Sequence, residues 1–154
     1  MPARSAGILA FRTNNGKLEV LLVHPGGPFW RNKDLGAWSI PKGEYGADED
    51  PQQVARREFH EELGVDITDA LAPLGEIRQR GGKTVTAFAA AADIDVTAIK
   101  SNTFEIEWPP RSGRKSEFPE IDRAAWFDLA SARAKINDAQ RTLLERLETL
   151  IGTG

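Results

Sequence analysis

One stretch, residues 43–65, constrains the fold of this chain more than any other because it marks both ends of a helix. Asp50 is a favourable N-cap residue, Pro51 suits the first helical position, and Gln53 stands where a capping-box partner would. Gly64 supplies the left-handed stop that ends many helices. The sequence therefore predicts a helix between Asp50 and Gly64.

An acidic face runs along this predicted helix. Glu58, Glu61 and Glu62 lie at spacings of three and four residues, which places their carboxylates together. Each like-charged pair costs about 0.2–0.5 kcal/mol in water, and the cost grows when the face is partly buried. An adjacent apolar stripe indicates that the helix packs on a core, so the acidic face should border a cleft. This stripe is Ala55, Phe59 and Leu63.

A hard divalent cation would relieve the repulsion between the three carboxylates, because such ions prefer oxygen ligands. Magnesium in particular keeps several waters and bridges to substrate phosphates. A solvated acidic helix face is the alternative interpretation, and three acids alone would favour it.

The spacing of the whole stretch favours the metal site instead. It fits the pattern Gly-x5-Glu-x7-Arg-Glu-U-x-Glu-Glu-x-Gly-U, where U is a bulky apolar residue. A chance match has a frequency on the order of 10⁻⁸ per starting point, because seven positions demand one residue type. The stretch resembles the Nudix box, the signature of the MutT-related Nudix hydrolase family. Its positions here are Gly43, Glu49, Arg57, Glu58, Phe59, Glu61, Glu62, Gly64 and Val65.

The resemblance implies an α/β (α+β) fold, in which a mixed β-sheet is sandwiched between α-helices, and a single domain over residues 1–154. It implies an enzyme that cleaves a nucleoside diphosphate linked to another group by attack of water on phosphorus. Mg²⁺ is the expected cofactor, with Mn²⁺ as an alternative, because a metal ion offsets phosphate charge and lowers the pKa of bound water.

The resemblance also implies roles for individual residues of the box. The Gly43 carbonyl, Glu58, Glu61 and Glu62 would form the metal site, with Glu61 or Glu58 as the general base. Phe59 stands where the family more often has an aliphatic residue, and it keeps the apolar character. Three further residues are expected to be structural, with an Arg57–Glu49 pair fixing the helix against the preceding loop. These are Glu49, Arg57 and Gly64.

A carboxylate outside the box often completes such a site. Glu120 lies just ahead of a predicted strand at 125–127, which resembles the position of the extra glutamate in RNA 5′ pyrophosphohydrolases of this family. An ordinary loop acid is the alternative interpretation of Glu120. Glu117 is the next candidate, followed by Glu105 and Glu107.

Substrate phosphates need cationic donors. Lys42 directly precedes Gly43, so its ammonium group should lie near the metal. A predicted basic loop leading toward Glu120 offers three more cations, for which a solvated surface loop is the alternative. These are Arg111, Arg114 and Lys115. A second basic group flanks a predicted turn and ranks lower. It consists of Arg78, Arg80 and Lys83.

A nucleobase needs a flat apolar surface. Phe29 and Trp30 lie in a predicted loop and are the best candidates for stacking, with Tyr45 as a further one. Trp38 and Trp108 occupy predicted strand positions, which are more typical of core residues.

The rest of the chain alternates strand and turn signals before it ends in helices. Asn15-Gly16 between two apolar runs predicts a hairpin. The segment 109–119 is rich in Pro, Gly, Ser and basic residues, which predicts a loop. Asp128 or Ser131 is expected to begin a small C-terminal helix, and Asn137 a longer one. The predicted strands are 5–12, 18–24, 37–40, 71–79, 84–92, 103–108 and 125–127.

Composition excludes several classes of site. The chain of 154 residues contains no cysteine and two histidines, which leaves no disulfide framework and disfavours a His/Cys zinc site. No apolar run reaches the about 18 residues needed to span a bilayer, and no signal peptide is evident, so a cytoplasmic protein without membrane contact is expected. The net charge of −3 gives no argument for nucleic acid. A homodimer is left open.

The substrate branch rests on a shorter resemblance. Trp38-Ser39-Ile40-Pro41-Lys42-Gly43 looks like the Trp-x-x-Pro-Lys-Gly of the diadenosine tetraphosphate hydrolase branch, but Asp48-Glu49 stands where that branch usually has Gly-Glu. The sequence therefore favours a nucleoside or dinucleoside polyphosphate as substrate. The alternatives are a nucleoside triphosphate pyrophosphatase, an RNA 5′ pyrophosphohydrolase and, in a different class, a nucleotide-binding Nudix module without hydrolysis.

Overall fold

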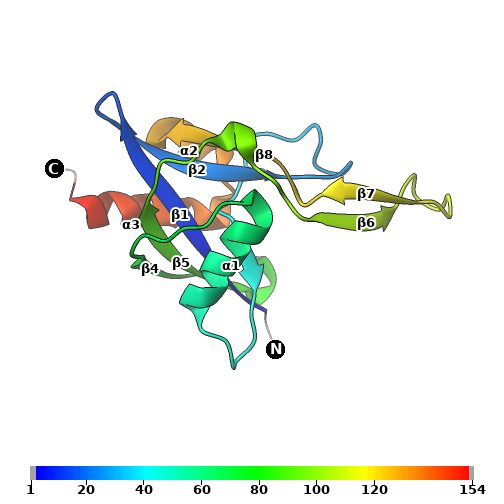
Figure 1. Cartoon of the computed structure of the whole chain (residues 1–154), viewed down its shortest axis with the longest axis horizontal. Helices are drawn as coiled ribbons and strands as arrows, with labels where there is room; N and C mark the ends of the chain where they lie inside the picture. The colour runs from blue at the N-terminus through cyan, green and yellow to red at the C-terminus, as the bar shows by residue number, and fades with distance from the viewer. Residues whose placement is uncertain (1–2, 153–154) are drawn as a thin grey trace.

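Strand β1 (Arg4–Asn14) lies at the centre of the sheet in the computed structural model, which describes residues 3–152 (Figure 1). It pairs in antiparallel fashion with β2 (Lys17–Pro25) and β3 (Lys42–Glu44), and in parallel with β5 (Thr84–Ala91). The predicted hairpin between β1 and β2 is confirmed. Its turn residues Asn15 and Gly16 have φ angles of 53° and 78°, as a two-residue type I′ turn requires.

Two further strands complete the main sheet at its edges. These are β4 (Ala72–Arg78), which pairs with β5, and β8 (Ile121–Asp128), which pairs with β2. The order along the sheet is β4-β5-β1-β2-β8, with β3 on β1 off this path. The sheet is therefore mixed, as predicted.

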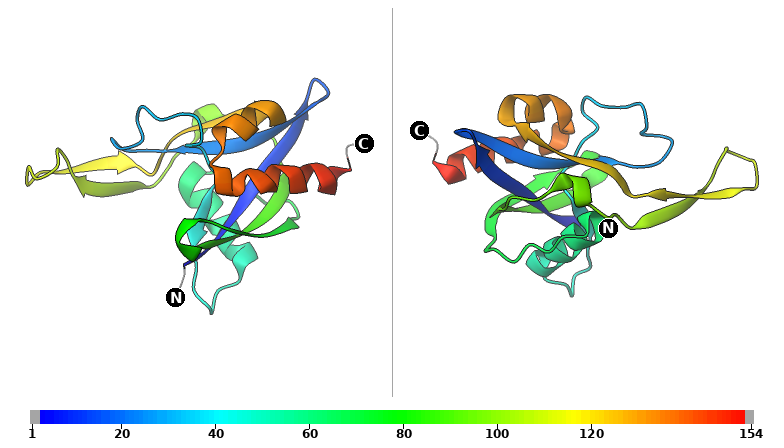
Figure 2. Two further views of the ribbon diagram at one scale, coloured as in Figure 1. Left: turned by 180° about the vertical axis from the view of Figure 1, so that it is seen from behind. Right: turned by 45° about the horizontal axis from the view of Figure 1, so that its top comes forward.

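Helices cover both faces of this sheet (Figures 1 and 2). The helix α1 (Pro51–Leu63) packs on one face, whereas α2 (Leu129–Lys135) and α3 (Arg141–Ile151) pack on the other. Within residues 3–152, no helix is long and apolar enough to cross a membrane. Short 3₁₀ helices lie at Arg80–Gly82, Val96–Ala98 and Asp138–Gln140.

Strands β1 and β2 are buried on both sides because their apolar residues are nearly continuous. Alternate residues point to opposite faces. Leu9 and Leu22 thus enter the core under α2 and α3, whereas Ile8 and Leu21 enter the core under α1. The predicted stripe on α1 fills this second core, since Ala55, Phe59 and Leu63 are fully buried.

The helix α1 begins and ends where the sequence predicts. Gly64 takes a φ of 72°, and its N–H donates to the His60 carbonyl. The capping-box expectation was wrong, because the side chain of Asp50 makes no capping hydrogen bond. Pro51 has no N–H to satisfy, which reduces the need for a side-chain cap.

Residues 101–120 form a feature that the sequence did not fully predict. Strand β6 (Thr103–Glu107) pairs with β7 (Lys115–Pro119) in a two-stranded ribbon that projects from the body (Figure 1). The prediction of a loop over 109–119 was therefore wrong for residues 115–119. The low β-propensity of Lys115, Ser116 and Pro119 hid this strand, and cross-strand contact between Phe104 and Phe118 compensates for it.

The segment 37–40, predicted as a strand, makes only isolated bridges. Ser39 bridges to Val23 and Trp38 to Ile136. Trp38 is buried in the core, as predicted. Gln140, fully buried at the start of α3, accepts a hydrogen bond from the Ile40 N–H through its Oε1 at 2.9 Å. The segment that leads into β3 is therefore held from the C-terminal end of the chain.

Replacement of Gln140 by Met should lower the free energy of unfolding by about 1–3 kcal/mol, because the buried Ile40 N–H loses its acceptor. Urea denaturation of the two proteins measures the difference. Gln52→Met on the exposed surface of α1 is the matched control and should change stability by less than about 0.5 kcal/mol. Equal stability of the two variants would contradict the structural role of Gln140.

Candidate metal and nucleotide site

Glu58 lies directly against the backbone of β3. A Cβ atom placed on Gly43 would come within 2.0 Å of the Glu58 carboxylate carbon. Any other residue at position 43 would therefore force this carboxylate to move. Gly43 at the start of the box motif and Glu58 on its helix are thus in contact. The junction between β3 and α1 is therefore built around the Glu58 carboxylate.

Glu62 is buried beneath the same strand, with 7% of the residue exposed. Its Oε2 accepts a hydrogen bond from the Lys42 N–H at 2.9 Å. Burial raises the pKa of Glu62 to about 8, against the opposing effect of the Lys42 N–H. A nearby cation would lower this pKa, because positive charge stabilises the ionised form.

The remaining box acids surround Arg57. Its Nη1 donates to Glu49 Oε2 at 2.9 Å, so the predicted pair is present, and Glu49 Oε1 accepts from the Gly46 N–H at 3.0 Å. The guanidinium also lies 3.7 Å from Glu58 and 4.0 Å from Glu61. Both partners of the Arg57–Glu49 pair are well exposed, so its contribution to stability should be small.

Glu120 lies close enough to the box to act on it electrostatically. Its charge contributes to the raised pKa of both Glu58 and Glu62, although burial is the largest cause in each case. The Glu120 backbone is held at the base of the ribbon, where its N–H donates to the Asn102 carbonyl and its carbonyl accepts from the Gly26 N–H, each at 2.8 Å. The runner-up acids Glu105, Glu107 and Glu117 lie along the ribbon itself.

These carboxylates fit a divalent cation that keeps part of its water shell. Burial raises the pKa of Glu58 and the neighbouring Glu61 carboxylate adds to this effect, whereas Arg57 opposes it. Across residues 3–152, no three Asp, Glu or His side chains converge on one point as a ready-made cation cage. Magnesium does not need such a cage, because it is usually held by one or two carboxylates, waters and substrate phosphates.

A cleft of about 600 Å³, large enough for a small-molecule ligand, lies next to the acids and is lined in part by Lys42. Lys42 binds Glu62 through its backbone and also lines this cleft. Burial lowers the pKa of the Lys42 ammonium, Glu62 opposes the shift, and Lys83 adds to it. Lys83 is therefore close to Lys42, and Arg80 lines the cleft as well.

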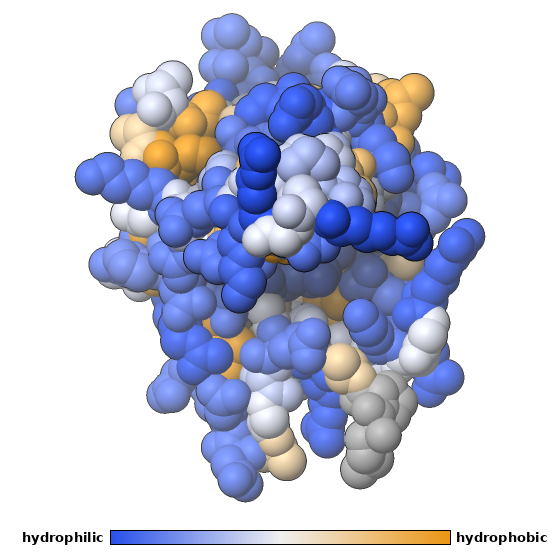
Figure 3. Space-filling model, turned by 90° about the vertical axis from the view of Figure 1, so that its right-hand side faces the viewer, coloured by the Kyte–Doolittle hydropathy of each residue, from blue (hydrophilic) through white to orange (hydrophobic). Residues whose placement is uncertain are grey.

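The two basic groups lie at different places relative to Lys42. Arg80 and Lys83 lie near Lys42, whereas Arg111, Arg114 and Lys115 lie at the far end of the ribbon. Five strand residues separate that end from Glu120, a distance of about 17 Å. Figure 3 views the molecule from the ribbon end, where strongly hydrophilic side chains project toward the viewer above a hollow in the surface.

The predicted aromatic residues divide between two places. Trp30 lines the cleft, and the Lys33 ammonium lies 5.1 Å from the centre of its ring. Phe29 faces the ribbon, where its ring meets Trp108 edge-on at 5.5 Å. The expectation that Trp108 belongs to the core was wrong, because it is half-buried at the end of β6. Tyr45 packs against the core under α1.

Sequence reasoning missed several residues of the cleft and its support. Asn137 and Asp138 line the cleft, whereas the sequence indicated only a helix start at Asn137. His24 is fully buried, and its ring nitrogens lie 2.8 Å from Asp122 Oδ1 and 2.6 Å from the Lys33 carbonyl. His24 thereby ties the loop that carries Phe29 and Trp30 to β8. Its partners are distant in sequence, so no local pattern could have identified them.

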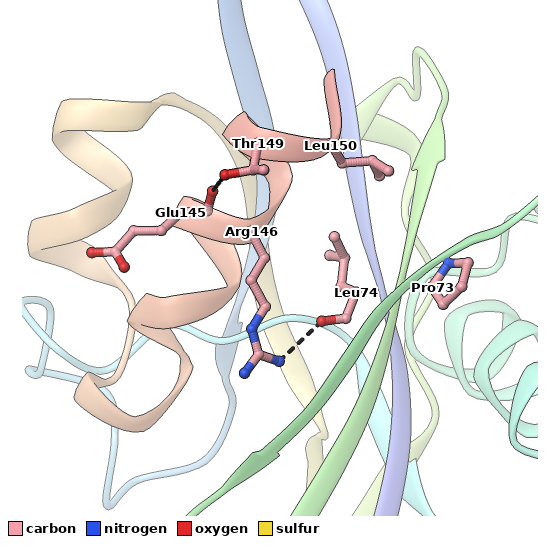
Figure 4. A pocket seen from close by; sticks show the side chains of 6 residues that line it. All are labelled: Pro73, Leu74, Glu145, Arg146, Thr149 and Leu150. Carbon is pink, nitrogen blue, oxygen red and sulfur yellow. Dashed lines mark hydrogen bonds between the residues drawn. The ribbon is translucent and has the colours of Figure 1, made fainter. Parts of the chain in front are cut away.

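A second groove, of about 460 Å³, lies between β4 and α3 (Figure 4). None of the predicted site residues lines it. Its one cation, Arg146, already donates to the carbonyls of Leu74 and Glu76, each at 3.0 Å. Arg146 thus covers the edge of β4, and the groove offers no free cation for a phosphate.

Comparison with known proteins identifies the type of domain. The family model of the NUDIX domain matches residues 1–147. A search of curated protein sequences finds no match.

Several solved structures share the fold. An Ap4A hydrolase from C. elegans, in a binary complex, is 20% identical, with 99% of each chain covered and a TM-score of 0.69. The NUDIX domain of NrtR from Shewanella oneidensis, bound to ADP ribose, is 18% identical over 98% of this chain and 89% of that one, with a TM-score of 0.68. A mutT/nudix family protein from Listeria innocua is 19% identical over 99% and 96% of the two chains, with a TM-score of 0.63.

Replacement of Gly43 by Ala should weaken Mg²⁺ binding about 10–100-fold, because the added methyl group displaces the Glu58 carboxylate. Titration calorimetry with MgCl₂ measures the change, and circular dichroism checks that the fold persists. Gly46→Ala is the matched control, since its Cβ would lie in ordinary contact with its neighbours, 3.9 Å from Glu49 Oε1. Unchanged Mg²⁺ affinity in the Gly43 variant would remove Glu58 from the metal site.

Proposed function

The chain belongs to the NUDIX family of phosphoanhydride hydrolases, and we propose that it cleaves a nucleoside polyphosphate with the help of Mg²⁺. One observation carries the proposal. Lys42 donates its backbone N–H to the buried acid Glu62 and also lines the cleft, as Arg80 does. An acidic site suited to a cation therefore adjoins a basic cleft suited to phosphates.

The residues that would hold the ion come from three segments of the chain. They are the Gly43 carbonyl on β3, the carboxylates of α1, and Glu120 at the base of the ribbon. When bound, a divalent ion offsets the charge of the phosphates and lowers the pKa of a water ligand. The carboxylates on α1 are Glu58, Glu61 and Glu62.

Glu61 is the better placed of the two candidate bases. Its side chain is 39% exposed, against 16% for Glu58, so it can reach solvent and accept a proton from the attacking water. Arg57 contacts both acids and Glu49, and it would hold them in place rather than react. Lys42, Arg80 and Lys83 would neutralise the polyphosphate, and Trp30 would stack on the base inside the cleft.

The likeness of fold to an Ap4A hydrolase supports a nucleoside polyphosphate as substrate, and so does the Trp38–Gly43 segment. Nucleoside triphosphates and 5′-triphosphorylated RNA are the alternatives. A nucleotide-binding module without hydrolysis is the candidate from another class, and the NrtR domain bound to ADP ribose has a similar fold. The complete set of box acids supports hydrolysis.

Purified protein should hydrolyse diadenosine tetraphosphate in the presence of MgCl₂, and Glu61→Gln should lower kcat about 10²–10⁴-fold because the water loses its proton acceptor. Chromatography of the products measures both, on a panel that also holds ADP-ribose, nucleoside triphosphates and triphosphorylated RNA. Glu145→Gln, an exposed acid on α3, is the matched control and should keep full activity. Binding of nucleotide without turnover of any panel member would favour the module.

Replacement of Arg80 by Ala should raise KM for the cleaved nucleotide about tenfold or more, because a charge-assisted hydrogen bond to phosphate is lost. Initial rates over a range of nucleotide concentrations measure this change. Arg78→Ala is the control, since Arg78 is exposed on β4 and is not among the residues that line the cleft. Equal KM values for the two variants would place the phosphates elsewhere.

A further inference from the structure

Phe29 is an aromatic side chain that the cleft does not use. It is 62% exposed, and the next residue, Trp30, is 40% exposed at the cleft wall. Of the four large apolar side chains that are exposed within residues 3–152, these two stand next to each other at the mouth of the candidate site. Exposed aromatic groups that are rigidly held are typical of binding surfaces.

The ribbon supports Phe29 without covering it. Trp108, at the end of β6, meets the Phe29 ring at an interplanar angle of 81°. An edge-on contact of this kind stabilises both rings and leaves ring faces free for a third aromatic group. Since most of Phe29 remains exposed, the pair forms an open platform, which we call the Phe29–Trp108 platform.

The platform is built before any ligand arrives. Gly26 lies so close to the ribbon base that an added Cβ would come within 2.0 Å of the Pro119 carbonyl oxygen, and its N–H donates to Glu120. Gly27 takes a φ of 97° against the Phe104 ring. The loop and the ribbon are thus fixed together, which lowers the entropic cost of binding a ligand on them.

The ribbon end beside the platform, residues 107–115, carries three cations against one acid, Glu107, whose carboxylate accepts the Arg111 N–H, and this excess of positive charge suits an anionic ligand. The Trp108 N–H donates to the carbonyl of Arg114 at 2.8 Å, so the cationic end of the ribbon begins beside the platform. Arg111 and Lys115 belong to the same end. These three cations do not line the cleft, and they lie at the end of the ribbon that carries Trp108. Attraction between them and a phosphate would add to the stacking.

We propose that the Phe29–Trp108 platform is a second nucleobase subsite, which binds the distal nucleoside of a dinucleoside polyphosphate while the first nucleoside and the phosphates occupy the cleft. This proposal rests on the proposed function. Phe29 and Trp30 are adjacent in the chain, about 3.8 Å apart at their Cα atoms, so the platform begins where the cleft ends. A free nucleoside triphosphate has no second base and cannot use both surfaces.

Binding of uncleavable analogues tests the platform independently of turnover. Titration calorimetry in buffer that contains MgCl₂ measures two Kd values, one for methylene-bridged diadenosine tetraphosphate and one for methylene-bridged ATP. The wild-type protein should bind the dinucleoside analogue about 5–150-fold more tightly, because this is the range that one stacked base contributes. In Phe29→Ala and Trp108→Leu, the ratio of the two Kd values should fall toward one.

Leu35→Ala is the matched control, because Leu35 is a 73% exposed apolar side chain of the same loop outside the platform. This variant should keep the wild-type ratio. A wild-type ratio near one, or a ratio that survives both platform variants, would overturn the second subsite. Hydrolysis of a nucleoside triphosphate with Mg²⁺ would in that case leave the proposed function standing, whereas a protein that cleaves no nucleotide loses the proposed function whatever the ratio.

Discussion

The seating of α1 on β3 is the contact on which the rest of the candidate site depends. The Glu62 carboxylate accepts the Lys42 N–H, and the Glu58 carboxylate lies where Gly43 lacks a side chain. A buried carboxylate is costly unless hydrogen bonds or a cation compensate for it. The fold accepts this cost at the point where a strand edge, a helix face and a cleft meet, which is characteristic of a functional site.

Support for this junction comes from distant parts of the chain. Strand β1 pairs with β3 in register, with Ala6 opposite Gly43. Gln140 at the start of α3 holds Ile40, two residues ahead of Lys42. Lys42 is therefore positioned between the acids and the cleft by contacts from three elements, namely β1, α1 and the start of α3. Side chains positioned by rigid elements in this way keep their geometry better than side chains on loops.

Local chemistry made much of the fold predictable. The β1–β2 hairpin follows from Asn15-Gly16, the end of α1 from Gly64, and the start of α2 from Asp128, whose side chain accepts from the Ser131 N–H. Each of these signals acts over a few neighbouring residues and does not depend on residues far away in the sequence. The strand β7 was not predicted, because its pairing with β6 stabilises it and its own composition does not favour a strand.

The sequence by itself determined the box, its helix and the set of acids on one helical face, because spacings of three and four residues fix side-chain direction without reference to other elements. Only the tertiary structure decided which acid is buried, which cations stand near Lys42, and where the aromatic residues lie. Arg80 lines the cleft and Arg111 does not, because the sheet order pairs both β3 and β5 with β1 and so brings the β4–β5 turn near Lys42. That order is set by contacts between residues far apart in sequence, which no local pattern encodes.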